Sequence, residues 1–370
     1  MADNKDKKVL NVPALRFPEF TGEWKRYKLS EVCSFYSGGT PSSSKKEYYN
    51  GNIPFIRSGE LHKDKTELFI TEDGLKNSAA KLVETGDLLL ALYGATSGDI
   101  AISKIKGAIN QAILCIRTKQ NKKFIESVWN KHVEKLLQTY LQGGQGNLSA
   151  DIVKNIPFYF ANLEEQVKLA SFISLLDERI ATQNKIIERL ETLIKGIVET
   201  VISSQKPNTL IKNCLECNSS TLQESQVAEI GTFPVYGATG ISGYTETADI
   251  NRESILIIKD GSGVGTVKFV TGEYSYIGTL NSLTAKDGYC LKYIYFSLQR
   301  FSFEPYKTGM AIPHIYFKDY GKAKIYCPSL SLQTLIAQKL SLIENKMEVE
   351  KRIILCYQLQ KSYLLSRMFI

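Results

Sequence analysis

Several features that would mark a membrane or secreted protein are missing from this 370-residue sequence. The longest apolar runs, such as Ile255–Ile258, are far shorter than the roughly 20 residues that a membrane-spanning helix needs. The opening residues, MADNKDKK, are charged and contain no apolar signal-peptide core. We therefore expect a cytoplasmic protein that neither crosses nor binds a membrane.

Metal ligands are also scarce. The seven cysteines and three histidines are scattered along the chain, and their pattern does not suggest a disulfide framework. Cys214 and Cys217 form one C-x-x-C pair, but a zinc site would need a second such pair or a nearby histidine. We expect no metal site and interpret the cysteines as ordinary reduced thiols.

Catalytic motifs are absent as well. No G-x-x-x-x-G-K-[ST] segment is present, which argues against an ATPase motor. The tetrapeptide NIPF occurs at Asn52–Phe55 and Asn155–Phe158, but both copies lack the first proline of the N-P-P-Y/F motif of DNA amino-methyltransferases. No Ser, Cys and His constellation supports nucleophilic catalysis. We therefore predict no catalytic residue in this chain.

The composition is that of a globular protein with room for two domains. Hydrophobic residues make up 43% and charged residues 23% of the chain, and the formal net charge is +8. Residues 20–162 carry 19 basic and 14 acidic side chains, whereas residues 207–330 carry 11 of each. The net charge permits an acidic partner such as nucleic acid. Because basic residues exceed acidic ones only in the first domain, a basic patch is expected in the first half alone.

An internal repeat is the strongest signal in the chain. The stretch DLLLALYGATSGDIAI at 87–102 and the stretch SILIIKDGSGVGTVKF at 254–269 both read apolar strand, glycine, three residues, glycine, strand. Gly94 and Gly98 correspond to Gly261 and Gly265, 167 positions later in each case. The same offset relates LEEQVKLASFISLLDERI from Leu163 to LSLQTLIAQKLSLIENKM from residue 330. We infer a tandem duplication.

The glycine cluster of the second copy has the spacing G-x-G-x-G, which raises the alternative of a phosphate or cofactor cradle. Such a loop should lead from a strand into a helix. Here the alternating segment TVKFV follows, and the first copy keeps the two outer glycines but not the central Gly263. This pattern predicts a hairpin turn.

The repeat predicts an α+β fold in which two β-rich domains alternate with two long helices, related by a pseudo-two-fold axis. The first domain should contain short strands near 54–57, 87–92, 100–102 and 112–116 and a helix over 123–141. The predicted parts are an N-terminal arm over 1–19, a first domain over 20–162, a helix over 163–204, a second domain over 207–330 and a helix over 331–370.

Both helices carry a heptad pattern typical of a coiled coil, so we expect them to pack antiparallel. The predicted pairing residues are Leu169, Ile173, Leu176, Ile180, Gln183, Ile187 and Leu190, continuing to Ile194, Ile197 and Val201, in the first helix, and Ile336, Leu340, Ile343, Met347, Glu350 and Ile354 in the second. The polar Gln183 and Glu350 either fix the register or lie solvated at a loose point of the seam.

Two similar domains suit a ligand with two separated recognition elements, and DNA read as two half-sites is the natural case. Lysines, aromatic residues and amides in loops can contact phosphates and base edges, although each such loop taken alone is more often simply solvated. The candidate contacts are Lys45, Lys46, Tyr48, Tyr49, Arg57, Gln145, Asn147 and Ser149 in the first domain, and Tyr236, Lys259, Lys307, His314 and Lys318 in the second.

The order of these parts resembles the specificity subunits of type I restriction-modification enzymes. The similar segments are RFPEFTGEWKRYKLSEV at Arg16–Val32, NIPF followed by LEEQ before the first helix, and the terminal LQKSYLLSRMFI. The resemblance covers essentially the whole chain. Two departures are the LSLQ that replaces LEEQ at 330–333 and the zero net charge of the second domain.

The resemblance implies a non-catalytic subunit. Each domain would read one half of a bipartite, asymmetric double-stranded DNA target, and the helix pair would set the spacer and dock two modification (methyltransferase) subunits. Restriction (translocase and nuclease) subunits would join them, and S-adenosylmethionine, ATP and Mg²⁺ would belong to those partners. The alternatives are a two-module coiled-coil scaffold that binds protein or glycan, and a stand-alone DNA enzyme, which the missing motifs disfavour.

Overall fold

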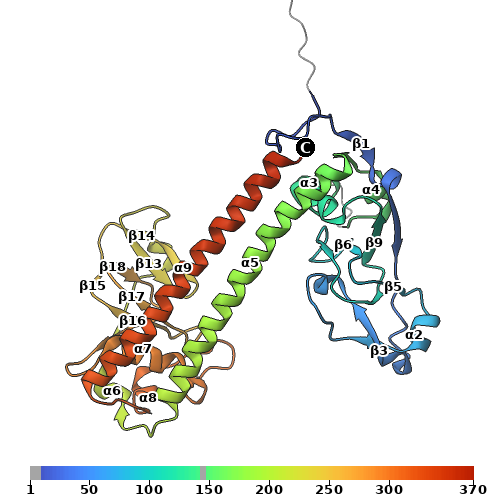
Figure 1. Ribbon diagram of the computed structural model, residues 1–370. Helices are drawn as coiled ribbons and strands as arrows, with labels where there is room; N and C mark the ends of the chain where they lie inside the picture. Colours follow the sequence, from blue (N-terminus) through green and yellow to red (C-terminus); the bar gives the residue numbers. More distant parts are fainter. Residues whose placement is uncertain (1–9, 142–146) are drawn as a thin grey trace, which may run out of the picture. The chain divides into compact units, whose positions relative to one another are not determined.

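The computed structural model describes residues 10–141 and 147–370. The chain forms two compact units, Met1–Gln183 with Ile353–Ile370, and Asn184–Arg352. Each unit contains one β-rich domain and a segment of each of two long helices, α5 (Leu163–Ile197) and α9 (Leu330–Met368), which Figure 1 shows in green and red. We describe the units separately.

The first unit contains two four-stranded sheets. One is antiparallel throughout, in the order β2 (Cys33–Ser37), β9 (Ile113–Thr118), β6 (Leu88–Ala91), β7 (Ile100–Ile102). The other has the order β4 (Phe69–Ile70), β3 (Tyr49–Ile56), β8 (Gly107–Ile109), β5 (Lys81–Val83), and its β3–β8 pair is parallel. A separate ribbon joins β1 (Lys25–Lys28) to β10 (Pro157–Phe160). The helices of this domain are α1 (Leu29–Val32), α2 (Glu72–Lys76), α3 (Lys122–Leu141) and α4 (Ala150–Asn155).

The second unit repeats this topology. Its antiparallel sheet has the order β12 (Leu215–Ser219), β19 (Leu280–Ala285), β16 (Ser254–Ile258), β17 (Val267–Val270). Its mixed sheet has the order β14 (Gly240–Thr245), β13 (Phe233–Gly237), β18 (Glu273–Tyr276), β15 (Ile250–Asn251), with β13 and β18 parallel. The other elements are β11 (Thr209–Leu210), β20 (Lys324–Ile325), α6 (Ile211–Cys214), α7 (Leu291–Gln299) and α8 (Phe317–Tyr320). The α+β class and the duplication are confirmed.

The duplicated glycine pairs form hairpin turns, as predicted. They connect β6 to β7 and β16 to β17, both antiparallel pairs. Gly94, Gly98, Gly261 and Gly265 all have positive φ, between 86° and 101°, which residues with a Cβ rarely adopt. The central Gly263 is not among the positive-φ residues. That difference explains why the first copy can carry a threonine at the equivalent place.

The first long helix begins at Leu163 because Asn162 caps it. The Asn162 side-chain oxygen accepts a hydrogen bond of 2.8 Å from the Glu165 backbone N–H. The helix continues into a π-helical segment, Val198–Ser203. This wider turn shifts the apolar stripe by one position: Ile202 is buried, whereas the predicted seam residue Val201 is 38% exposed.

The predicted seam residues do not face a partner helix alone. Leu169, Ile173 and Leu176 are buried in the core of the first domain, together with Leu364 and Met368 from α9. In the second unit the corresponding cluster contains Ile194, Ile336 and Leu340, with Ile197, Ile343 and Met347 packed against it. One apolar stripe therefore anchors each helix to a domain core as well as to the other helix.

The middle of the seam is less buried. Ile180, Gln183, Ile187, Leu190 and Ile354 are intermediate in exposure. Glu350 is buried and forms an ion pair with Lys346 on the same helix. In the first unit, Asp177 of α5 forms an ion pair with Lys361 of α9. Arg179, which lies further along α5, donates to the hydroxyl of Tyr357, which lies earlier along α9. The two helices therefore run antiparallel in this unit.

The glutamine that the two helix motifs share makes the same contacts in both units. The Gln166 side chain is fully buried; its oxygen accepts from the Asn121 backbone N–H (3.0 Å), and its nitrogen donates to the Ala161 carbonyl (2.8 Å). Gln333, 1% exposed, accepts from the Cys290 N–H (3.0 Å) and donates to the Pro328 carbonyl (2.8 Å). We call these two residues the glutamine clasps, because each ties a long helix to the start of α3 or α7.

A second repeated contact lies further along each helix. Lys123 of α3 forms an ion pair with Asp177 of α5 (2.7 Å), and Lys292 of α7 forms one with Glu344 of α9 (2.8 Å). Asp177 and Glu344 are equivalent under the 167-residue offset. Within the residues that the structure describes, no helix is long and apolar enough to cross a membrane.

Candidate nucleic-acid interface

The first group of predicted contacts lies at the start of β3. Lys46 is exposed. Lys45 is exposed but bound: its ammonium donates to the Tyr48 hydroxyl (2.9 Å) and lies 4.9 Å from the centre of that ring. Tyr48 is buried, and the Tyr49 hydroxyl donates to the Pro41 carbonyl (2.6 Å). The two tyrosines hold this loop in place, whereas the lysines are the groups that face solvent.

Arg57 is held by two carboxylates. Its guanidinium donates to Glu60 (3.0 Å) and Glu67 (3.1 Å). Burial alone would raise the pKa of the Glu60 carboxyl, but hydrogen bonds from Arg57 and Thr66 outweigh burial and hold that pKa at about 2. The Arg57 charge is therefore compensated within the domain, which weakens its attraction for a phosphate.

The third predicted group belongs to the segment before α4. Asn147 is exposed. The Ser149 hydroxyl caps α4 by accepting from the Ile152 N–H (3.1 Å). Gln145 lies outside the described residues. This capping role is sufficient to explain the serine at position 149, so DNA binding is not needed to account for it.

In the second domain, Tyr236 lies on β13. Its ring packs edge-on against Tyr274, and the ammonium of Lys268 lies 4.6 Å from its centre. Lys259 follows β16 and is half-buried, and its backbone carbonyl accepts from the Ile315 N–H (2.9 Å). Strand β16 thereby connects to the loop that carries the remaining candidates.

Lys307 and His314 lie in the loop 307–316, and Lys318 lies in α8. His314 is half-buried, and its ring nitrogen lies 3.2 Å from the Ile312 carbonyl oxygen. Lys307 pairs with Glu304, whereas Lys318 is exposed and its ammonium lies 5.1 Å from the centre of the Tyr316 ring. Met310 of the same loop is not among the residues predicted from the sequence, although its side chain is fully exposed. Hydrophobic pattern alone gave no signal, because an isolated methionine is usually buried.

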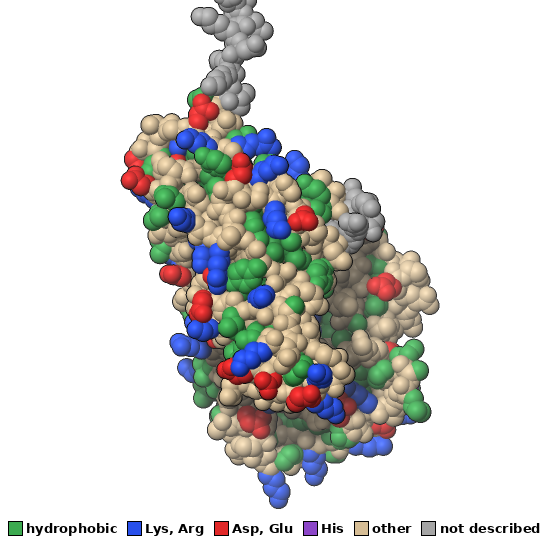
Figure 2. All heavy atoms as spheres, turned by 90° about the vertical axis from the view of Figure 1, so that its right-hand side faces the viewer, with side chains coloured by type: hydrophobic (Ala, Val, Ile, Leu, Met, Phe, Trp, Pro, Cys, Tyr) green, Lys and Arg blue, Asp and Glu red, His purple; other side chains and the backbone are tan. Residues whose placement is uncertain are grey.

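Basic side chains do not merge into one stripe on the face seen in Figure 2. Lys and Arg side chains are spread over it with Asp and Glu among them. All seven cysteines are free thiols. The described part of the chain holds no group of three or more His, Cys, Asp or Glu side chains that could bind a metal ion.

Exposed leucines on the long helices repeat with the duplication. Leu163 corresponds to Leu330, and Leu175 corresponds to Leu342, with the offset of 167 residues. Leu193 corresponds to Leu359 after the alignment slips by one residue. All six side chains are about half exposed or more. Each unit thus presents three leucines at equivalent positions without burying them.

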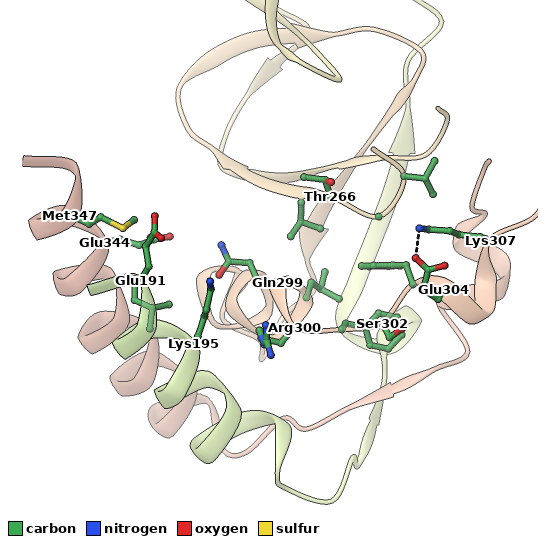
Figure 3. A pocket seen from close by; sticks show the side chains of 17 residues that line it. Glu191, Lys195, Thr266, Gln299, Arg300, Ser302, Glu304, Lys307, Glu344 and Met347 are labelled. Atoms are coloured by element: carbon green, nitrogen blue, oxygen red, sulfur yellow. Dashed lines mark hydrogen bonds and ion pairs between the residues drawn. The ribbon is translucent and has the colours of Figure 1, made fainter. Parts of the chain in front are cut away.

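A cavity of about 720 Å³ lies in the second unit, between α5, α7, α9 and the β16–β17 turn. Figure 3 shows Glu191, Lys195, Gln299 and Glu344 around one side of it and the Lys307–Glu304 ion pair at the other. Three basic and three acidic side chains line the cavity. This balance gives it no preference for an anion over a cation.

A protein-family model, described as the type I restriction modification DNA specificity domain, matches residues 21–192 and 212–355. The chain belongs to this family. It contains two type I DNA specificity domains in tandem, and each matched range spans one β-rich domain and part of a long helix.

Curated relatives of these specificity domains include the EcoR124I/EcoR124II specificity subunit of Escherichia coli, 27% identical over 48% of this chain and 45% of the relative. The MjaVIII specificity subunit of Methanocaldococcus jannaschii is 24% identical over 54% of this chain and 46% of the relative. The match thus spans about half the length of these two relatives. The EcoprrI specificity subunit of Escherichia coli is 21% identical over 85% of this chain and 86% of the relative.

Solved structures share the fold of the tandem specificity domains. A type I restriction-modification S subunit from M. genitalium superposes with a TM-score of 0.67, at 17% identity, over 97% of this chain and 99% of the other. A chain from a study of complex assembly in the type I system superposes with a TM-score of 0.53, at 15% identity, over 94% and 97%. At these identities the likeness concerns the fold.

Proposed function

We propose that this chain is the non-catalytic DNA-specificity subunit of a type I restriction-modification complex. Each specificity domain reads one half of a bipartite target, and the continuous helices α5 and α9 set the number of base pairs between the halves. The observation that carries this proposal is the duplication itself, since two domains with one topology are attached to the helices through the same clasp. Such a molecule suits a ligand with two separated recognition elements.

The helices also dock the modification subunits in this proposal. Two sets of exposed leucines at repeat-equivalent positions, led by Leu175 and Leu342, favour two copies of one partner over two different partners. Burying a leucine contributes about 1.5–3 kcal/mol, so these side chains add affinity to a larger contact along the helices.

Catalysis then belongs to the partners. The methyltransferase subunits bind S-adenosylmethionine and methylate adenine, and the restriction subunits use ATP and Mg²⁺ for translocation and cleavage. The complex works in the cytoplasm, where its DNA is. This chain contributes base readout through exposed residues such as Lys46, Asn147 and Lys318.

A domain exchange tests the proposal. Residues 207–330 are replaced by the corresponding residues of a relative, and the methylated adenines are sequenced in cells that carry the chimaera with its methyltransferase. We expect one half of the target sequence to change and the other half to stay the same. Methylation should still require the same methyltransferase.

The reciprocal exchange of residues 20–162 is the matched control and should change only the other half. If either exchange alters both halves, the division of labour is wrong. If the unmodified chain and its methyltransferase methylate no bipartite target, the specificity function itself is wrong, and a protein- or glycan-binding scaffold becomes the better hypothesis.

A further inference from the structure

The loop between Thr308 and His314 is closed more tightly than a solvated surface loop needs to be. Thr308 and His314 exchange both backbone hydrogen bonds, at 2.9 and 2.8 Å. Gly309 has φ of +90°, and a Cβ added there would lie 2.3 Å from the Ile312 carbonyl oxygen. The tip therefore depends on glycine at 309 for its shape.

The same loop is attached to the duplicated glycine turn. The Gly261 N–H donates to the Pro313 carbonyl (2.9 Å), and the Ile315 N–H donates to the Lys259 carbonyl (2.9 Å). Ile315 is buried in the core of the second domain. These bonds hold the loop against the end of β16, so its tip has little freedom to fold back onto the domain.

Two apolar side chains point outward from this tip. Met310 is fully exposed, and Ile312 is 66% exposed. Neither belongs to a hydrophobic cluster of its unit. A single exposed apolar residue is common on protein surfaces. Two such side chains on a rigid tip keep apolar surface in water and add no packing that would stabilise the domain. Their chemistry indicates a partner that accepts them.

The neighbouring polar groups favour DNA as that partner. Lys318, in α8 just after the loop, is exposed, and its ammonium lies 5.1 Å from the centre of the Tyr316 ring. His314 is half-buried and closes the loop, with its ring nitrogen 3.2 Å from the Ile312 carbonyl oxygen. A stable protein–protein contact buries about 800 Å² on each side, which two side chains cannot supply. A base step, by contrast, accepts a single methionine or isoleucine inserted from the minor groove.

We propose that Met310 and Ile312 form a wedge that enters the minor groove of the half-target held by the second domain and partly unstacks one base step. This inference rests on the proposed function, because it needs a duplex bound to that domain. Unstacking is least costly at pyrimidine–purine steps. The wedge therefore adds sequence preference at a step where no side chain hydrogen-bonds to a base.

The test uses the complex of this chain with its methyltransferase subunits. Duplexes that contain its target carry 2-aminopurine at successive positions of the half-target read by the second domain. We expect the wild-type complex to raise the fluorescence several-fold at one step. In the double variant Met310→Ala, Ile312→Ala that signal should be lost, with binding weakened about tenfold.

Three matched variants sharpen the test. Ile230→Ala removes another highly exposed isoleucine of the same domain and should leave the signal intact. Met310→Leu should retain it, because leucine can also insert. Gly309→Val should reduce it, because the tip loses its conformation.

The outcomes are separable. An unchanged fluorescence signal in the double variant overturns the wedge while leaving the specificity function standing. Loss of methyltransferase assembly in that variant shows that the tip is a protein contact, which also overturns the wedge. If the wild-type complex binds no specific duplex, the proposed function fails, and the wedge fails with it.

Discussion

The two units of this molecule share their helix-to-domain joints but differ around them. In the first unit Asp177 pairs with Lys123 and also with Lys361 of α9 (2.5 Å). In the second unit Glu344 pairs with Lys292. Lys195, which is equivalent to Lys361, instead lines the 720 Å³ cavity of Figure 3, and no ion pair of Lys195 occurs among the described residues.

The two units differ in which contacts both copies of the repeat retain. The glutamine clasps bind backbone groups, whose geometry does not depend on the side chains around them, and both copies retain them. The neighbouring acid was not retained. Glu165 accepts from Arg16 (2.7 Å) and from the Trp24 indole (3.2 Å), whereas the equivalent Leu332 accepts nothing and is 42% exposed. The first unit thus contains an Arg16–Glu165–Trp24 cluster that the second unit lacks at the equivalent position.

The largest expected effect is on the clasps. Gln166→Leu leaves the buried Asn121 N–H and Ala161 carbonyl without their partner, and Gln333→Leu does the same to Cys290 and Pro328. Because each unsatisfied buried group costs about 1–3 kcal/mol, we expect each variant to lower the free energy of unfolding by about 2–4 kcal/mol. Denaturant unfolding monitored by circular dichroism measures this.

Gln166→Leu should be the more severe of the two, because Gln166 also donates to the Gln120 side chain (2.8 Å). Gln360→Leu on the exposed face of α9 is the control and should be nearly neutral. If only Gln166→Leu or only Gln333→Leu loses stability, the two glutamine clasps are not equivalent, and the two units are not joined to the helices in the same way.

A smaller effect is expected on partner binding. Leu175→Asp and Leu342→Asp each place a charge at one of the equivalent exposed positions. Each loses about 1.5–3 kcal/mol of apolar burial. We expect each variant to bind one methyltransferase copy at least tenfold more weakly and to retain the other, as measured by mass photometry of the reconstituted complex.

Leu82→Asp, at an exposed leucine on β5, should assemble normally. Leu176→Asp serves as the contrast, since the neighbouring Leu176 is buried in the first core and its substitution should unfold that unit. If Leu175→Asp and Leu342→Asp both keep two copies bound, the repeated leucines are not docking sites.

The smallest effect concerns the ion pairs. Burial opposes ionisation of Asp177, but hydrogen bonds from Lys123 and Lys361 outweigh it and lower its pKa below the ordinary value. Because the folded pKa lies below the unfolded value of about 4, the stabilisation is fully present above that pH and is lost as the pH falls through the folded pKa. At neutral pH, Asp177→Asn should cost about 1–2 kcal/mol, and Glu344→Gln, with a single ion-pair partner, about half as much.

Thermal unfolding between pH 7 and pH 2 measures both parts of this prediction. The gap between wild type and Asp177→Asn should narrow in acid. Lys361→Ala should be destabilising, whereas Lys195→Ala should lie within about 0.5 kcal/mol of wild type. An equal loss of stability in Lys361→Ala and Lys195→Ala would contradict the proposed difference between the two units.

Much of the architecture follows from the sequence by itself. The 167-residue offset, the paired glycines and the heptad stripes are periodic or repeated patterns, and such patterns depend on local geometry that neighbouring residues determine. They predicted the duplication, the class of fold, both hairpin turns and the long helices. The family resemblance followed from the same segments.

Tertiary structure alone decided which side chains remain free to act. Tyr48, Arg57 and Ser149 have the chemistry of DNA contacts, but burial, two carboxylates and a helix cap engage them internally. Met310 has the chemistry of a core residue and is fully exposed. Side-chain availability depends on contacts between residues far apart in the chain, such as Gly261 with Pro313, and no local pattern encodes those.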